Sequence, residues 1–174
     1  MSTRTFYRWI ALALCAAAAV AGAQEPVGGN KACALVTPSE LETAVGGKVS
    51  LSAGGGTPPN GAEICRAETA TVSVLLRVVK RSGGSDADKK GGAEKAGIDM
   101  ARKMGAQVDV KTFGDITCST VVPPADLAKY GFNTTCAITT ATAVAAIEVT
   151  AKNQKDMVPI ERLRPLAEKM ATRL

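Results

Sequence analysis

Hydrophobic and polar residues alternate along much of the chain, and this alternation predicts β-strands. The clearest run is 71–80, where valine or leucine occupies every second position from Val72 to Val78. The intervening positions, which include Leu75 and Arg77, are mixed, so the second face of this strand is either partly solvated or covered by a helix. Weaker alternation predicts further strands at 48–52, 63–67, 107–112, 116–122, 133–140 and 142–152.

A helix is predicted directly after Thr37. This threonine suits the N-cap position, Pro38 suits the first helical position, and Glu40 completes a Thr-x-x-Glu capping box. Gly46 or Gly47 should end the helix, because glycine accepts the left-handed conformation found at helix ends. The sequence therefore predicts a short, well-defined helix before the first strand.

A second helix is predicted at 93–104, before a stop at Gly105. The segment that precedes it, 81–92, is rich in Gly, Asp and Lys and is expected to be a loop. The apolar side chains of the helix share one stripe, which should be buried against the sheet. They are Ala93, Ala96, Met100 and Met104.

The last predicted helix spans 159–174 and contains Pro165. Proline removes a backbone hydrogen bond inside a helix, so we expect a kink there, or a turn followed by a terminal helix. The complete order is helix, three strands, helix, four strands, helix. That order is typical of an α+β domain with a mostly antiparallel sheet.

Residues 1–23 have the layout of a signal peptide. Two arginines precede an apolar run that is too short to span a bilayer, and the Ala-Gly-Ala of 21–23 matches a cleavage site. We therefore expect a mature domain of residues 24–174 in the periplasm or secreted, with no membrane insertion after cleavage. Lipidation at Cys15 is an alternative, although Leu14 stands where a lipobox needs a small residue.

Four cysteines remain after cleavage, an even number that favours two disulfides in an exported protein. Three pairings are possible. We prefer Cys33 with Cys65 and Cys118 with Cys136, because the strands on either side of 123–131 should fold back and place Cys118 opposite Cys136. The sequence has no Cys-x-x-Cys motif and no histidine, so a metal site is not expected.

Charge and composition argue against nucleic acid as a partner. Cleavage leaves 19 Lys and Arg against 16 Asp and Glu, a net charge of +3, and the basic residues are interleaved with acids or apolar residues. Phe113, Tyr130 and Phe132 are the aromatic residues of the mature chain. So few rings offer little surface for stacking on bases or sugars.

Residue types also argue against most enzyme chemistry. Without histidine there is no Ser-His-Asp or Cys-His nucleophile, and the glycine-rich runs lack the spacing of a phosphate loop. The acids near predicted strands are Glu63, Glu68, Asp115 and Glu148, for which surface or turn-capping roles are expected. We therefore expect a non-catalytic protein that uses no cofactor.

The stretch 33–40, Cys-Ala-Leu-Val-Thr-Pro-Ser-Glu, is followed by a Val-Gly-Gly helix end and by Cys65. Together these resemble a family of small exported bacterial domains of unknown function, best known from actinobacterial lipoproteins that open Cys-x-Leu-Leu-Thr-x-x-Glu. Phe-Gly-Asp at 113–115 resembles that family's Gly-Leu-Gly-Asp turn, and 166–174 resembles its closing helix. The chain departs from the family in its second cysteine pair and in Arg66, where an aromatic residue is common. The resemblance implies an envelope-facing α+β domain and carries over no activity or site.

These observations favour an exported domain that binds a partner protein or belongs to an envelope assembly. The predicted hairpin tip, 123–132, is the candidate site, because it holds two of the three aromatic residues on a loop near a predicted disulfide. Alternatively, its aromatic residues simply close the end of the sheet. The alternative function is a small inhibitor of a periplasmic or foreign hydrolase, which would present this loop to an active site. The candidate binding residues are Asp126, Lys129, Tyr130 and Phe132.

Overall fold

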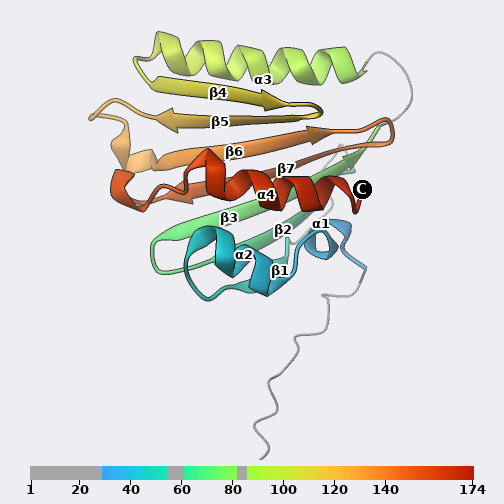
Figure 1. Ribbon diagram of the computed structural model, residues 1–174. Coiled ribbons are helices and arrows are strands. Elements are labelled where there is room, and N and C mark those ends of the chain that lie inside the picture. The colour runs from blue at the N-terminus through green and yellow to red at the C-terminus, as the bar shows by residue number, and fades with distance from the viewer. Residues whose placement is uncertain (1–28, 55–60, 82–85) are drawn as a thin grey trace, which may run out of the picture.

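A seven-stranded antiparallel sheet forms the centre of the molecule (Figure 1). The computed structural model describes residues 29–54, 61–81 and 86–174, and the predicted signal peptide lies outside them. The strands lie in the order β1-β2-β3-β7-β6-β5-β4. Their bounds are β1 (Ser50–Ala53), β2 (Glu63–Glu68), β3 (Val72–Lys80), β4 (Gln107–Phe113), β5 (Ile116–Val122), β6 (Phe132–Thr139) and β7 (Ala143–Ala151).

The described helices are α1 (Lys31–Ala34), α2 (Pro38–Val45), α3 (Asp86–Lys103) and α4 (Ile160–Ala171), with short 3-10 turns η1 (Ala128–Tyr130) and η2 (Gln154–Asp156). Figure 1 shows α1, α2 and α4 on one face of the sheet and α3 beside the edge strand β4. The α4 helix packs over β5 and β6, α1 packs over β2 and β3, and α2 packs against α4. This arrangement confirms the predicted α+β class and order of elements, with α1 as an additional short helix.

The α2 helix begins as its sequence predicts. The Thr37 hydroxyl accepts from the Glu40 amide at 3.3 Å, and the Glu40 carboxylate accepts from the Thr37 amide at 3.0 Å. At the other end Gly46 has φ of +79°, and its amide donates to Glu42 O at 2.8 Å. The capping box and the left-handed glycine thus define both ends of the helix.

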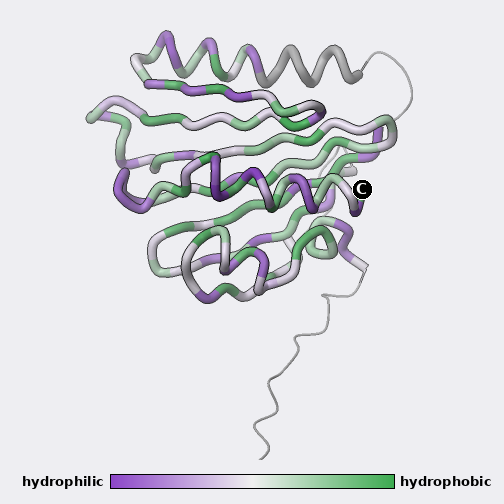
Figure 2. Tube along the Cα trace, in the orientation of Figure 1, coloured by the Kyte–Doolittle hydropathy of each residue, from purple (hydrophilic) through white to green (hydrophobic). Residues whose placement is uncertain are grey.

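The hydrophobic core lies between the sheet and the helices that cover it. Every second side chain of the middle strands is buried there, and hydrophobic positions gather in those strands, whereas the edge strand β4 is more hydrophilic (Figure 2). One stripe of α4 faces the same core, and its buried residues are Ile160, Leu163, Leu166, Ala167 and Met170. The alternation predicted for 71–80 is confirmed, with Val72, Val74, Leu76 and Val78 on the core side.

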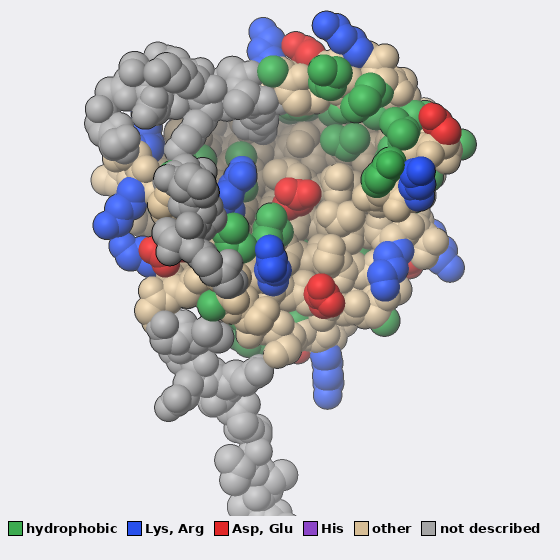
Figure 3. Space-filling view, turned by 180° about the vertical axis from the view of Figure 1, so that it is seen from behind, with side chains coloured by type: hydrophobic (Ala, Val, Ile, Leu, Met, Phe, Trp, Pro, Cys, Tyr) green, Lys and Arg blue, Asp and Glu red, His purple; other side chains and the backbone are tan. Residues whose placement is uncertain are grey.

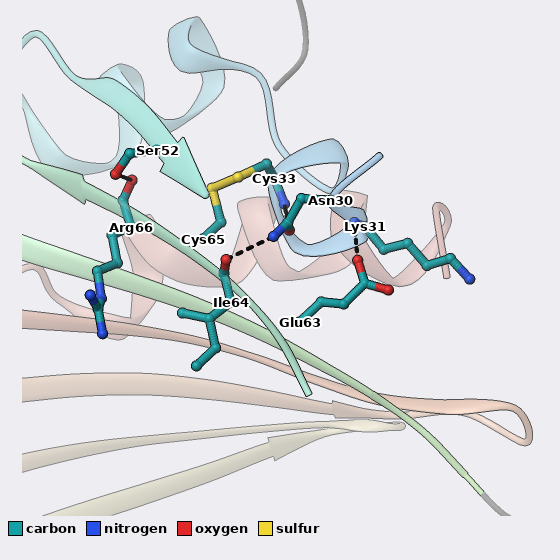
Figure 4. Close-up of a disulfide and its surroundings, with 8 residues drawn as sticks. All are labelled: Asn30, Lys31, Cys33, Ser52, Glu63, Ile64, Cys65 and Arg66. Carbon is teal, nitrogen blue, oxygen red and sulfur yellow. Dashed lines mark hydrogen bonds between the residues drawn. A yellow bond between two sulfur atoms is a disulfide. The ribbon is translucent and has the colours of Figure 1, made fainter. Parts of the chain in front are cut away.

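Two disulfides link the elements, and both have the preferred pairing. Cys33 of α1 bonds to Cys65 of β2, and Cys118 of β5 bonds to Cys136, its direct partner across the hairpin on β6. Figure 4 shows how the first bridge is supported: the Asn30 side chain accepts from the Cys33 amide at 3.1 Å and donates to Ile64 O at 3.0 Å. The bridge and Asn30 together hold the start of the described chain against β2.

The prediction for α3 was wrong in two respects. The helix begins at Asp86, so most of the segment expected to be a loop is helical. The apolar stripe was expected to be buried, but its residues from Ala96 onward are exposed. Met100 and Met104 are 57% and 53% exposed, and Ala96 is exposed as well. The physical reason is the position of α3: it lies beside an edge strand, which offers a narrower apolar surface than a sheet face.

The predicted division of the last segment into a turn and a separate terminal helix was also wrong, whereas the predicted kink stays a prediction. A single helix, α4, runs from Ile160 to Ala171 with Pro165 inside it. Buried side chains on both sides of the proline, such as Leu163 and Leu166, pack into one core. That packing compensates for the hydrogen bond that proline cannot donate.

Candidate functional site

The predicted hairpin tip is an ordered loop between β5 and β6. Successive turns support it: the Leu127 amide donates to Pro124 O at 2.9 Å, and the Tyr130 amide donates to Leu127 O at 3.0 Å. The Gly131 amide closes the last turn on Ala128 O at 3.1 Å. Together with the Cys118–Cys136 bridge, these bonds make the loop a defined surface feature.

The four candidate residues of this loop do not form one site. Phe132 is 9% exposed and belongs to the core, so for this residue the structural alternative is correct. Tyr130 is 70% exposed, and the Lys129 Nζ atom lies 5.1 Å from its ring centroid. Asp126 is exposed on the same loop. The structure therefore brings Lys129 and Tyr130 together on the surface and separates Phe132 from them.

Lys129 and Tyr130 border a cleft of about 250 Å³, whose other walls include Ser73 of β3 and Thr150 of β7. Its floor requires glycine at position 131: φ there is +95°, and a Cβ atom would lie 2.5 Å from Thr150 Cγ2. The loop thus closes tightly onto one end of the sheet, on the side away from α4.

That side of the sheet has its own set of side chains, which we call the rear face. In antiparallel pairs, directly opposite residues point to the same side of the sheet, so the strand register gives rows of neighbours. The central row crosses every strand and consists of Ser52, Arg66, Leu75, Glu148, Thr135, Ser119 and Val110. Flanking rows are Ile64, Arg77, Ala146, Ala137, Thr117 and Thr112, and Glu68, Ser73, Thr150, Asn133, Val121 and Val108.

The rear face is hollowed in its middle, where most side chains are uncharged and a few acidic and basic groups lie among them (Figure 3). Its central side chains, including Leu75, Thr135 and Ala146, are half-buried, and Ser119 is 8% exposed. None of the described helices packs over these central strands on this side: α1, α2 and α4 lie on the opposite face, and α3 packs beside β4. Within the described ranges, the rear face is therefore a concave surface that no helix covers.

Hydrophobic side chains gather along one margin of this face, over α3 and the strands next to it (Figure 3). Met100 of α3 and Met104, directly after the helix, are large hydrophobic residues that are exposed, and the Gly105 turn that follows them lies beside Pro124 of the hairpin loop. Val108 and Val110 continue the apolar surface on β4. Exposed methionines with an adaptable shape are frequent on protein-binding surfaces.

A second cleft lies on the helical side, between α2 and α4, with a volume of about 450 Å³. Glu40 and Lys169 belong to its polar wall: the two terminal guanidinium nitrogens of Arg173 each donate to the Glu40 carboxylate at 2.7 Å, and Lys169 lies 3.3 Å from it. The hydrogen bonds from Arg173 are the main reason why the pKa of Glu40 lies well below its usual range, and that of Arg173 is raised. These residues already satisfy one another, so the cleft is primarily a junction between the helices.

A third cleft, of about 320 Å³, separates α4 from β4. Lys111 Nζ lies 2.8 Å from Glu161 Oε1, and the hydrogen bond raises the pKa of Lys111 and lowers that of Glu161. The Arg164 guanidinium lies 4.3 Å from the Phe113 ring centroid. Here too the charged groups are engaged with one another.

Most of the rear face was not predicted from the sequence. A mixed second face was predicted only for 71–80, although the same pattern occurs in 116–122 and 142–152. In those strands Thr117, Ser119 and Glu148 alternate with core residues, and that alternation was the available signal.

Among the described residues, no three His, Cys, Asp or Glu side chains form a group that could hold a metal ion. Within the same ranges, none of the helices is both long and apolar enough to cross a membrane. Comparison with protein-family models, with curated proteins and with solved structures found no match to this chain. The resemblance of the 33–40 motif to a family of exported domains therefore stays a prediction.

Proposed function

We propose that this protein is an exported, non-catalytic domain that binds a partner protein on its rear face. The observation that carries the proposal is the hollowed centre of that face, where Glu148 lies between Leu75 and Thr135, with an apolar margin on one side. Protein-binding surfaces commonly combine a centre depleted of charge with exposed Met or aromatic residues, and this face has Met100, Met104 and Tyr130 near its borders.

Export supports the same proposal. The predicted signal peptide accounts for an oxidising destination, and the two disulfides are suited to one. An envelope location, periplasmic or secreted, follows as part of the proposal. The family resemblance of the 33–40 motif points to the same compartment.

Site-specific photocrosslinking in the host organism tests this function. A benzophenone amino acid at Thr135, in the centre of the rear face, should give a discrete crosslink to another protein, whereas the same group at the exposed Thr43 of α2 should not. Excess wild-type protein should compete for the crosslink, and a Leu75→Arg variant that fills the hollow should not compete. Identical crosslinks from Thr135 and Thr43, or none from Thr135, would refute the proposed binding face.

Inhibition of a hydrolase remains the second candidate, because Tyr130 is 70% exposed on a loop that a disulfide supports. The purified oxidised protein should then inhibit lysozyme or a protease in a panel, and Tyr130→Ala should abolish the inhibition while leaving the thermal unfolding midpoint unchanged. Inactivity across the panel would eliminate this candidate.

A further inference from the structure

Glu148 occupies the middle of the rear face. It lies on β7, the fourth strand in the order of the sheet, directly opposite Leu75 on one side and Thr135 on the other. The row continues from Thr135 to Ser119, so two hydroxyl groups follow the carboxylate across the hollow. Ala146 and Thr150 are its neighbours along the strand, and the Glu148 side chain is half-buried among these residues.

Glu148 has no hydrogen bond and no ion pair within the described residues, and this distinguishes it from the other carboxylates. Glu40, Glu42, Glu63 and Asp156 are also half-buried, but each has a hydrogen-bond partner. Glu68, Asp115 and Asp126 have no partner in the same ranges, but they are exposed to water. Of the carboxylates whose surroundings the structure describes, Glu148 is thus the one that is both half-buried and unpaired.

Arg77 is the nearest described cation in the register. It lies diagonally from Glu148, one row away, because Arg77 is opposite Ala146 and Leu75 is opposite Glu148. No ion pair joins them within the described chain, and Arg77 is exposed, so its guanidinium group reaches solvent. Among the described residues, no cation therefore neutralises the carboxylate.

The size of the hollow limits what can enter it. From Leu75 on β3 to Val110 on β4 the central row crosses four strand spacings, about 19 Å, which accommodates one helix or one extended segment. A second copy of the sheet would meet this concave surface with another concave surface. A convex polypeptide segment fits better.

An occupant of this hollow removes water from Glu148. A carboxylate that loses its water without gaining a partner is strongly destabilised, and a positively charged donor on the occupant compensates this loss best. Leu75 and Ala146 on either side suit the aliphatic stem of a Lys or Arg side chain. The valines and methionines of the margin suit apolar residues of the same segment.

Building on the proposed function, we infer that the rear face binds a polypeptide segment of a partner protein that places a Lys or Arg side chain against Glu148. Glu148 is the specificity-determining residue of the face, and the apolar margin supplies contact area around it. The partner is thereby defined chemically: a basic residue flanked by aliphatic or aromatic residues.

A random dodecapeptide library displayed on phage tests this inference on the oxidised protein. Peptides are kept only if a Thr135→Arg substitution, which blocks the hollow, abolishes their binding. The kept peptides should share a Lys or Arg between apolar residues. A synthetic peptide from this set should bind Glu148→Gln at least tenfold more weakly, whereas Glu68→Gln, which removes an exposed acid at the border, should change the affinity less than twofold.

The outcomes separate the inference from the proposed function. Peptides that need the hollow but bind wild type and Glu148→Gln equally would overturn the role of Glu148 and leave the binding face intact. Failure to obtain any peptide that Thr135→Arg blocks would overturn both. If Glu148→Gln and Arg77→Gln destabilise the protein equally and non-additively in urea, the two residues form an internal pair, and the inference is wrong.

Discussion

Glu40 is the residue through which stability should depend most directly on pH. Hydrogen bonds from Arg173 lower its pKa in the folded state, so its contribution is complete above the unfolded pKa of about 4.3 and is lost as the pH falls toward the folded value. Glu40→Gln should reduce the free energy of unfolding by about 1 kcal/mol at neutral pH and flatten its decline below about pH 5. Urea denaturation at a series of pH values measures both effects.

Glu161→Gln is the matched control, because Glu161 also pairs with a cation but is exposed to solvent. Water and salt screen such a pair, so its removal should change the pH profile much less. Equal slopes for wild type and Glu40→Gln would contradict the assigned role of the Arg173 pair.

Gly131 of the hairpin loop should be more sensitive to substitution than Gly114 of the β4–β5 turn. Its φ of +95° is unfavourable for other residues, and a Cβ atom would lie 2.5 Å from Thr150 Cγ2 and 3.1 Å from Ala151 O. Gly131→Ala should cost about 3 kcal/mol, because strain and a steric clash add. Gly114→Ala provides the comparison: φ is +59° with open space around it, so about 1 kcal/mol is expected. Similar losses in the two variants would show that the loop yields to the clash.

At the scale of elements, the two disulfides should each stabilise the folded protein, but they should restrain different parts of the fold. Cys33–Cys65 closes a separation of 32 residues and ties α1 to the sheet, whereas Cys118–Cys136 joins strands that already pair over a separation of 18. Replacing either pair by alanine should cost about 3 to 4 kcal/mol. Only the loss of Cys33–Cys65 should accelerate amide hydrogen exchange at residues 30–36, because only that bridge anchors them. Faster exchange there in both double variants would refute this division.

Elements whose signals are local were the ones that the sequence predicted well. The capping box at Thr37, the alternation in 71–80 and the equidistance of Cys118 and Cys136 from the hairpin centre depend on neighbouring residues alone. Errors arose where tertiary contacts decide. Whether Met100 is buried depends on α3 lying beside an edge, and whether Pro165 breaks α4 depends on the core beneath it.

The candidate site shows the same division. The burial of Phe132 and the exposure of Tyr130 depend on how the loop packs against Thr150, which the sequence does not show. The position of Glu148 in the centre of the hollow depends on the strand register. In the sequence it is one acid in an alternating strand. The burial of Glu148 and its lack of a partner among the described residues follow from the assembled sheet, so composition and motifs do not indicate them.

For the whole molecule, signal-peptide cleavage and the formation of two disulfides together predict the intact mass of the protein. Protein isolated from its own host should begin at Gln24, with an intact mass about 4 Da below that of the reduced chain, because each disulfide removes two hydrogen atoms. Alkylation should add nothing before reduction and four adducts after it. A chain that begins at Cys15 with added lipid would contradict cleavage after Ala23 and place the protein on a membrane.

Native mass spectrometry of the same sample extends the argument to the rear face: an additional polypeptide that the Leu75→Arg variant loses is the partner predicted here, whereas a bare monomer means that binding is too transient to survive purification.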